Sequence, residues 1–169
     1  SRYVVKIARN PFERAVSSFV HAYRHGYEDQ PLADALGRVV DRRNRFSFRE
    51  FVHYLESIDL RLCNTHHCLQ TTPLERHVLF GLKPHQVIRI EDGLEAALGE
   101  IERSFALPPT DFSNPVFRSG HHTSRVQSTA LAADRKDLWP HDLPSAAAFY
   151  DDDQAARIAR LYAEDFRRY

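Results

Sequence analysis

The start of the chain contains a short apolar run and then a segment whose apolar residues have helical spacing. Residues 3–8 form a short, β-branched apolar run, which predicts a buried strand. Asn10, Pro11 and Glu13 come next and are typical of a capped helix start, with Glu13 completing a capping box. The apolar spacing then predicts a helix that continues to about Tyr27. A strand, a tight turn and an amphipathic helix in this order indicate an α/β fold.

The helix expected after Asn10 has one apolar and one polar face. At about 100° per residue, the apolar face consists of Phe12, Val16, Phe19, Val20, Tyr23 and Tyr27. The polar face carries Arg14, Ser17, Ser18, His21 and His25. The hydroxyl of Ser17 can donate to a ligand only if this polar face borders the ligand.

The middle of the chain predicts two further helices and a loop. Within the polar segment 28–46, a short helix is expected from Leu32, Leu36, Val39 and Val40, and an arginine-rich loop follows at residues 42–45. Ser47 and Glu50 form another capping-box motif. It precedes an apolar stripe made of Phe48, Phe51, Val52, Leu55 and Ile58. Residues 63–76 show no period and are expected to be a loop.

The second half predicts one strand, two helices and an irregular segment. Residues 85–90 form a second apolar strand, and residues 110–148 are proline-rich and irregular. Between them lies a helix with an apolar side made of Leu94, Ala97, Leu98, Ile101 and Phe105. Three aspartates favour the start of a last helix, which runs to about Arg168. Its inward side chains are expected to be Ile158, Leu161, Tyr162 and Phe166.

Length and charge limit the class of protein. The chain has 169 residues, which fits a single domain over residues 1–169. Its 23 basic and 23 acidic side chains balance, which argues against a general nucleic-acid binder but allows a local basic pocket. No apolar run approaches the about 18 residues that a membrane-spanning helix needs. The chain begins at Ser1 and contains no Met, so we expect an upstream part of the domain to be missing.

The positive charge comes almost entirely from arginine. Lys6, Lys83 and Lys136 are the lysines of the chain. A GC-rich genome explains this bias most simply. The alternative is oxyanion binding, because the guanidinium group matches phosphate and sulfate with two parallel hydrogen bonds. Composition alone does not decide between these explanations.

Two cysteines and two histidines lie close together in the sequence. Cys63, His66, His67 and Cys68 supply four potential zinc ligands within six residues. Their spacing matches no common zinc module, and no second ligand pair follows at the usual distance. Free thiols or a local disulfide are the favoured alternatives, and we expect no metal cofactor.

The end of the first expected strand is a candidate anion site. Open α/β sheets bind ligands beyond the carboxyl ends of their strands, and a helix N-terminus favours an anion there. Arg9 stands at this point, and Ser17 lies two turns into the helix. Alternatively, Arg9 pairs with a surface carboxylate and Ser17 is solvated. The local sequence leaves both possibilities open.

Residues 5–19 resemble the 3′-phosphate-binding segment of sulfotransferases that use 3′-phosphoadenosine 5′-phosphosulfate, in particular the carbohydrate sulfotransferase branch. The pattern of that branch is a strand, then Arg-x-Pro-x-x-Arg-x-x-Ser and an aromatic residue. The matching residues are Arg9, Pro11, Arg14, Ser17 and Phe19. The resemblance implies a P-loop-like sulfotransferase fold, in which many helices flank a small parallel sheet.

Weaker similarities follow in the order found in the family. Residues 48–55 resemble a Phe-x-x-Phe-Val-x-x-Leu helix, and residues 64–70 resemble an Asn-x-His-Trp-x-Pro-Gln segment. In the second segment His67 replaces the Trp and Leu69 replaces the Pro. Two later segments resemble a strand that ends in Glu and a closing Tyr-x-x-Asp-Phe helix: residues 87–92 and 161–166.

The resemblance implies sulfuryl transfer from the nucleotide to a hydroxyl of a carbohydrate or other small metabolite. In the family, the residues that match Arg9 and Ser17 hold the 3′-phosphate. Arg118 resembles an arginine of the family's Arg-Lys-Gly loop on the same phosphate, or else is an exposed loop residue. His66 is the candidate for acceptor contact or proton transfer, or else a loop histidine that bonds the backbone. Glu91 either meets the acceptor or caps a helix.

One feature of the family is not found in this sequence. No Pro-Lys-x-Gly-Thr-Thr-like loop, which would hold the 5′-phosphosulfate, is present. In the family this loop precedes the segment that contains Arg9, so we expect it upstream of Ser1. The alternative function is a non-catalytic binding domain that has the sulfotransferase fold but lacks the loop. Arg14 is expected to make a structural ion pair rather than to bind the nucleotide.

The expected partners are the nucleotide sulfate donor and a hydroxylated acceptor, most simply a carbohydrate. No nucleic acid and no membrane segment is expected. The arginine-rich composition favours a bacterial protein, and bacterial members of this family are typically cytoplasmic. The Golgi lumen is the alternative compartment, because animal carbohydrate sulfotransferases are Golgi proteins.

Overall fold

The expected strand–turn–helix unit opens the chain. The computed structural model describes residues 3–77, 81–114, 131–137 and 143–169. Strand β1 (Val5–Ala8) leads through Arg9 and Asn10 into helix α1 (Pro11–His25). In the described residues, this unit belongs to a mixed α/β arrangement with a two-stranded parallel sheet and several helices.

Asn10 caps α1, but not in a capping box. Its Oδ1 accepts a hydrogen bond from the Phe12 backbone N–H at 2.9 Å. The backbone N–H of Asn10 donates to Glu91 Oε1 instead of Glu13, at 2.9 Å. The box expected from the sequence is therefore wrong, because a carboxylate from a distant segment takes its place. The helix ends at Gly26, whose φ of 69° lies in the left-handed region that glycine tolerates.

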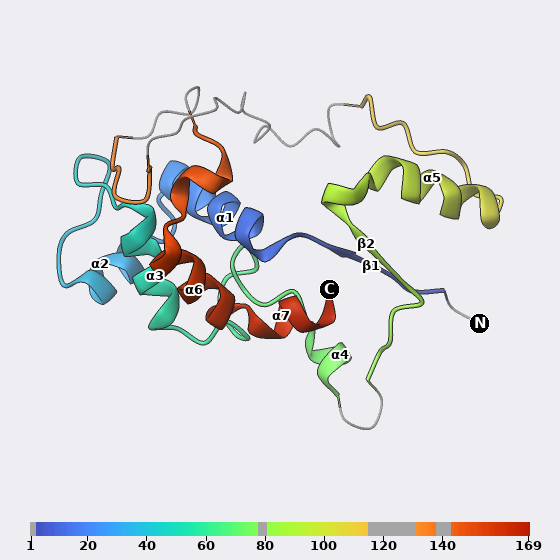
Figure 1. The fold of residues 1–169 in the computed structure, drawn as a ribbon, viewed down its shortest axis with the longest axis horizontal. Helices are drawn as coiled ribbons and strands as arrows, with labels where there is room; N and C mark the ends of the chain where they lie inside the picture. The colour runs from blue at the N-terminus through green and yellow to red at the C-terminus, as the bar shows by residue number, and fades with distance from the viewer. Residues whose placement is uncertain (1–2, 78–80, 115–130, 138–142) are drawn as a thin grey trace.

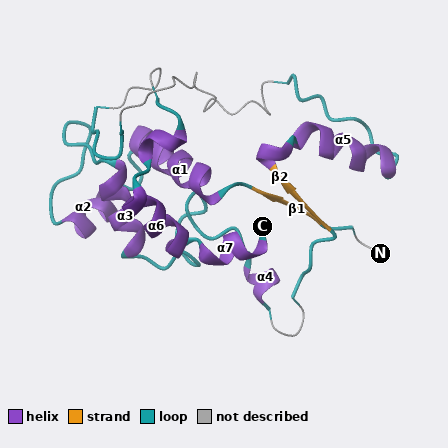
Figure 2. Ribbon diagram, viewed as in Figure 1, coloured by secondary structure: helices purple, strands orange, loops and turns teal. Residues whose placement is uncertain are grey.

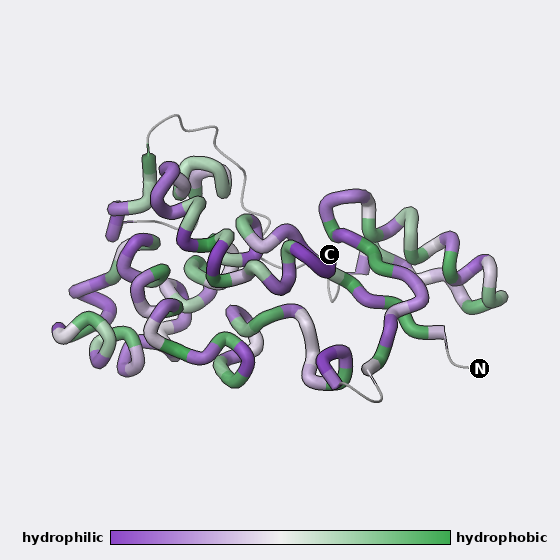
Figure 3. The backbone as a smooth tube through the Cα atoms, turned by 60° about the horizontal axis from the view of Figure 1, so that its bottom comes forward, coloured by the Kyte–Doolittle hydropathy of each residue, from purple (hydrophilic) through white to green (hydrophobic). Residues whose placement is uncertain are grey.

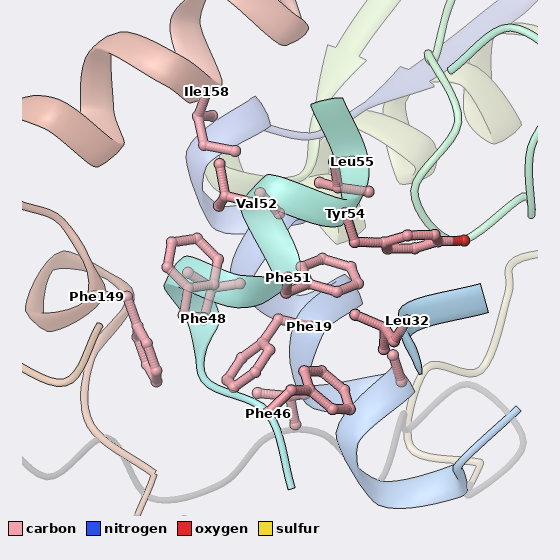
Figure 4. Close-up of a cluster of buried hydrophobic side chains, with 14 of the residues drawn as sticks. Phe19, Leu32, Phe46, Phe48, Phe51, Val52, Tyr54, Leu55, Phe149 and Ile158 are labelled. Atoms are coloured by element: carbon pink, nitrogen blue, oxygen red, sulfur yellow. The ribbon is translucent and has the colours of Figure 1, made fainter. Parts of the chain in front are cut away.

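A cluster of buried aromatic side chains holds the helices together (Figure 4). The apolar face of α1 packs against α3 (Phe48–Glu56), α6 (Asp152–Leu161) and the 3₁₀ turn η3 (Ala146–Phe149). Helix α2 (Asp29–Leu36) packs on α3. The Phe19 ring lies within 5.9 Å of the four rings of Phe46, Phe48, Phe51 and Phe149. Burying one such side chain stabilises the fold by about 1.5–3 kcal/mol, so this cluster anchors the molecule.

The capping box expected for α3 is confirmed. The Ser47 hydroxyl accepts from the Glu50 backbone N–H at 3.2 Å. The Glu50 carboxylate in turn accepts from the Ser47 N–H at 2.8 Å. The apolar stripe of α3 is buried in the aromatic cluster.

The sheet extends away from the helical cluster (Figure 1). Strand β2 (Gln86–Arg89) pairs with β1 in parallel, with Val5 opposite Gln86 and Ala8 opposite Arg89. The strands are not fully buried as expected, since Ile7 is 46% exposed and Val87 is 40% exposed. Both strands run in the same direction, so their carboxyl ends lie together at the end nearest α1 (Figure 2).

Helix α5 (Leu94–Ser104) follows the 3₁₀ turn η1 (Ile90–Asp92) and lies along the sheet (Figure 1). Hydrophobic and hydrophilic positions alternate along it (Figure 3). None of its residues is fully buried, and Phe105, just beyond its end, is 48% exposed. The apolar side expected from the sequence therefore exists but is only partly covered.

Two further elements differ from expectation. A short helix, α4 (Pro73–Arg76), lies within the segment expected to be a loop, and Thr72 caps it. The single expected last helix is divided at Tyr162 into α6 and α7 (Ala163–Arg168). Tyr162 is buried as expected, whereas Phe166 is partly exposed. Within the residues that the structure describes, no helix has the length and apolar character needed to cross a membrane.

Candidate functional site

Oppositely charged side chains meet where the two parallel strands end. Arg9 follows β1, and Glu91 follows β2. Arg9 Nε lies 3.9 Å from Glu91 Oε1, and Arg9 Nη2 lies 4.0 Å from Glu13 Oε2. Both distances are at the outer limit of an ion pair, so these carboxylates hold the guanidinium loosely. Glu91 therefore contacts the α1 cap and Arg9, and the sequence had left its role open.

A pocket of about 320 Å³ lies beside Arg9, along the polar face of α1. It brings together three of the site residues named from the sequence: Arg9, Ser17 and His66. The rest of its lining consists of Ile7, Ala8, Arg14, Ser18, His21, Thr65, Gln70 and Ile90. None of these described residues is a carboxylate, and two are arginines. The pocket thus offers a cationic, donor-rich environment of the kind that binds oxyanions.

The pocket lies along α1 rather than at its tip. The lining residues of α1 begin at Arg14 and continue through Ser17 and His21, and none comes from the first three helical positions. The polar face of α1 therefore borders the pocket, which is the condition for Ser17 to donate to a ligand. A bound anion would lie beside the first turns of the helix, where the dipole is weaker than at the tip.

The side-chain amide of Gln70 makes hydrogen bonds to both backbone polar groups of Arg9. Its Oε1 accepts from the Arg9 N–H at 2.8 Å, and its Nε2 donates to the Arg9 carbonyl at 2.8 Å. This pair of hydrogen bonds resembles the exchange between two paired strands. It sets the direction in which the Arg9 side chain leaves the chain.

Asp165 holds the segment that contains Gln70. This carboxylate is fully buried in α7 and accepts hydrogen bonds from the backbone N–H groups of Gln70 and Thr71 at 2.9–3.1 Å. The Lys6 ammonium group also donates to the Gln70 carbonyl. Elements at both ends of the chain therefore position Arg9 through Gln70.

Arg14 binds carbonyl groups rather than a carboxylate. Its guanidinium donates to the Thr65 carbonyl at 3.1 Å and also to the Cys68 carbonyl. Its Cζ lies 6.0 Å from the centre of the Tyr162 ring. The structural ion pair expected for Arg14 is not found among the described residues, because its guanidinium bonds backbone carbonyls of residues 65–68 instead.

His66 stacks on His21 at the pocket wall. The two ring centres are 3.8 Å apart, and the ring planes differ by 29°. Tyr27 lies beside both rings, at 5.0 Å from His21 and 5.9 Å from His66. His66 is exposed to solvent, so it can reach a ligand in the pocket.

His67 points into the core, on the other side of the same loop. It is fully buried against Phe51 and Tyr54, and its Nε2 lies 3.8 Å from Glu28 Oε1. The Glu28 carboxylate accepts from the Tyr54 hydroxyl at 2.7 Å. Burial lowers the pKa of His67 to about 4, and Arg14 acts in the same direction.

The four potential zinc ligands do not converge. His66 and His67 lie on opposite sides of the loop, and Cys63 and Cys68 are free thiols. Burial, together with the nearby Cys68, raises the pKa of Cys63 to about 11. Across the described part of the chain, no three histidine, cysteine, aspartate or glutamate side chains are grouped as a metal site would require.

A second, smaller pocket of about 200 Å³ also borders Arg9. It includes Arg89 and also two carboxylates, Glu91 and Asp92. The Arg89 guanidinium donates to the Tyr169 carbonyl at 2.6 Å. This mixed charge makes the second pocket a weaker candidate for an anion.

Arg118, the remaining site residue named from the sequence, lies outside the described residues. The role of Gln70 was not foreseen. Gln70 belongs to the segment 64–70 that resembles the sulfotransferase family, which was the available signal.

No protein-family model matches the chain, and no curated protein and no solved structure matches it either.

Proposed function

We propose that the chain supplies the 3′-phosphate site of a sulfotransferase domain that binds 3′-phosphoadenosine 5′-phosphosulfate and transfers its sulfuryl group to a hydroxyl of a carbohydrate or similar small molecule. One observation carries the proposal. Arg9 and Ser17, which match the 3′-phosphate ligands of that family, line one pocket that contains no described carboxylate. The pocket also lies beside the carboxyl ends of two parallel strands, where open α/β folds bind ligands.

The residues present fit a nucleotide phosphate. Arg9 supplies a guanidinium group whose present carboxylate contacts are long, at 3.9 and 4.0 Å. A phosphate offers shorter, charge-assisted hydrogen bonds, typically 2.7–2.9 Å. Ser17 adds a hydroxyl donor to the lining of the same pocket. Gln70 keeps the Arg9 backbone in place, so the Arg9 side chain can move to the ligand without a change in the backbone.

His66 is the described residue best placed to act on an acceptor. In the proposed reaction the acceptor oxygen forms a bond to sulfur while the bond from sulfur to the bridging phosphate oxygen breaks. The acceptor proton passes to a base, and the phosphate leaves with the bonding electron pair. We assign the base to the exposed imidazole of His66, which lines the same pocket as Arg9. Such a base contributes about 10²–10⁴-fold to the rate.

Calorimetric titration with 3′-phosphoadenosine 5′-phosphate tests the proposal. We expect it to bind at least tenfold more tightly than adenosine 5′-phosphate, which lacks the 3′-phosphate. Replacing Arg9 with alanine is expected to weaken binding by about 10–100-fold, since a hydrogen bond to a charged group contributes about 1.5–3 kcal/mol. Arg160→Ala removes an exposed arginine of α6 and is the control.

Three results distinguish the possibilities. No binding, or binding that Arg9→Ala leaves unchanged, would contradict the proposed site. Binding without sulfuryl transfer to any hydroxylated acceptor would favour the non-catalytic binding domain. Nucleotide binding accompanied by sulfuryl transfer would support the enzyme, provided that Arg9→Ala weakens binding and His66→Gln abolishes transfer.

A further inference from the structure

One carboxylate oxygen, at the point where the two strands end, makes the contacts that a bound anion would make. Glu91 Oε1 accepts from the Asn10 backbone N–H at 2.9 Å and lies 3.9 Å from Arg9 Nε. Asn10 is the N-cap of α1, so this oxygen also lies at the positive end of the helix dipole. Backbone N–H groups, guanidinium groups and helix N-termini are the usual donors to oxyanions. Glu91 is therefore an anion that the chain itself supplies to Arg9.

The two contacts of Glu91 differ in strength. Its hydrogen bond to the Asn10 N–H has an ordinary length, whereas its distance to Arg9 is about 1 Å longer than a charge-assisted hydrogen bond. The side chains of Arg9 and Glu91 are 33% and 34% exposed, so water screens the attraction between them. Glu91 can thus lose Arg9 to a stronger anion and still keep its hydrogen bond to Asn10.

Arg9 belongs to both pockets and is the group over which a ligand and Glu91 compete. It lines the larger pocket together with Ser17 and the smaller pocket together with Glu91. Glu13, the other described carboxylate within 4.0 Å of its guanidinium, lies on α1 itself. Glu91 instead follows β2, so its contact with Arg9 joins two separate elements. A phosphate in the larger pocket has to take Arg9 from a carboxylate that the smaller pocket contains.

We propose that Glu91 is an internal competitor for Arg9, which holds the guanidinium until a phosphate replaces it and thereby lowers the affinity of the site for the nucleotide. This inference rests on the proposed function, in which Arg9 binds the 3′-phosphate. Sulfuryl transfer leaves that phosphate unchanged, so its contacts stabilise the donor and the spent nucleotide alike and do not accelerate the transfer. A carboxylate that weakens these contacts favours release of the spent nucleotide at no cost to the chemical step.

Glu91→Gln tests the competition. The amide oxygen can still accept from the Asn10 N–H, and only the charge is removed. We expect 3′-phosphoadenosine 5′-phosphate to bind about three- to tenfold more tightly in calorimetry, the range that a partly exposed ion pair supports. The melting temperature should stay close to that of the parent. Asp92→Asn is the matched control, because it removes the next carboxylate of η1, which also lines the smaller pocket, and it should change the affinity less than twofold.

A double-mutant cycle with Arg9 separates competition from general repulsion. If Glu91 acts by holding Arg9, Glu91→Gln should change nucleotide affinity less than twofold in the Arg9→Ala background. If the carboxylate simply repels the bound anion, the gain should be the same in both backgrounds. A purely structural role at the α1 cap predicts a lower melting temperature and no gain in affinity.

Inorganic phosphate is the second probe, and it distinguishes this proposal from the proposed function. Nucleotide affinity that Glu91→Gln does not raise, or raises equally without Arg9, would overturn the competition while leaving the nucleotide site in place. If the nucleotide does not bind but Glu91→Gln tightens phosphate binding in an Arg9-dependent way, the competition stands and the proposed function fails. Failure of Glu91→Gln to tighten the binding of either probe would overturn the competition.

Discussion

Gln70 connects the pocket to the rest of the molecule at the level of a single side chain. Its amide group makes both hydrogen bonds to the Arg9 backbone, and its own backbone N–H is held by Asp165. It also lines the pocket. A change at Gln70 therefore acts on the position of Arg9 and on the charge of the pocket at the same time.

Replacing Gln70 with glutamate adds the carboxylate that the described pocket lining lacks. The new side chain can still accept from the Arg9 N–H but can no longer donate to the Arg9 carbonyl. We expect nucleotide affinity to fall at least tenfold, since a like charge near a bound anion is repulsive. Calorimetry measures the affinity, and thermal denaturation shows whether the fold is kept.

The salt dependence of the Gln70→Glu effect separates repulsion from misfolding. The loss of affinity should shrink as the salt concentration rises, because salt screens exposed charges. A Gln70→Glu variant with unchanged affinity at low salt would show that the anion does not occupy this pocket.

The sequence could identify some site residues and not others. Arg9 and Ser17 lie in one strand–helix unit, so a local motif is sufficient to place them in one pocket. The contact between Arg9 and Gln70 joins segments 61 positions apart. The stack of His21 on His66 depends on how residues 64–70 pack against α1. No spacing rule within one element predicts such contacts.

Local caps decide where the helices begin and end. Gly26 and Gly37 end α1 and α2, with φ of 69° and 63°. A Cβ added at Gly26 would lie 2.9 Å from the Asp29 carboxylate, whereas at Gly37 nothing lies within 4 Å. Substitutions at the two glycines therefore separate the energetic cost of backbone strain from that of steric crowding.

Alanine at these two positions is expected to destabilise the protein by different amounts. Gly37→Ala carries only the left-handed strain, about 1 kcal/mol, and Gly26→Ala should cost about 2 kcal/mol because Asp29 must also move. Urea denaturation of both variants measures the free energy of unfolding. Equal losses would show that the Asp29 side chain moves aside without cost.

Elements with local determinants could be predicted, and those fixed by distant contacts could not. The cap and stripe of α3 are confirmed because residues 47–58 contain all the information required. The box expected at Glu13 fails because Glu91 takes the Asn10 N–H from 81 positions away. The break between α6 and α7 was missed because Tyr162 is fixed in the core, where its hydroxyl donates to the His67 carbonyl.

Positive and negative charges balance over the whole molecule but not in the lining of the larger pocket. The formal net charge is zero, and many arginines pair with carboxylates away from the pocket. Arg157 with Glu56 and Arg49 with Asp151 are examples, at 2.6 and 2.7 Å. The described pocket lining keeps two arginines and no carboxylate. The overall balance thus conceals a local cationic site.

The stability of the molecule should depend on pH through its buried groups. Burial lowers the pKa of His67 to about 4, whereas the unfolded chain protonates it near 6.5. Unfolding then takes up a proton below pH 6.5, so stability is complete above that pH and is lost as the pH falls towards 4. The loss between pH 6.5 and pH 5 is about 2 kcal/mol.

Chemical denaturation across this pH range tests the role of His67. His67→Gln removes the titrating group and should flatten the dependence of stability on pH. His53→Gln removes an exposed histidine of α3 and should leave the slope of the parent. Parallel curves for the parent and His67→Gln would show that another group carries the effect.

The central claim is that a nucleotide 3′-phosphate binds between Arg9 and Ser17. A titration of ¹⁵N-labelled protein with 3′-phosphoadenosine 5′-phosphate, followed by backbone amide chemical shifts, locates the nucleotide directly. We predict the largest shifts at residues 9–21 and 65–70, and their loss in Arg9→Ala. Shifts confined to the smaller pocket beside Arg89 and Tyr169, or no shifts at millimolar nucleotide, would contradict the claim.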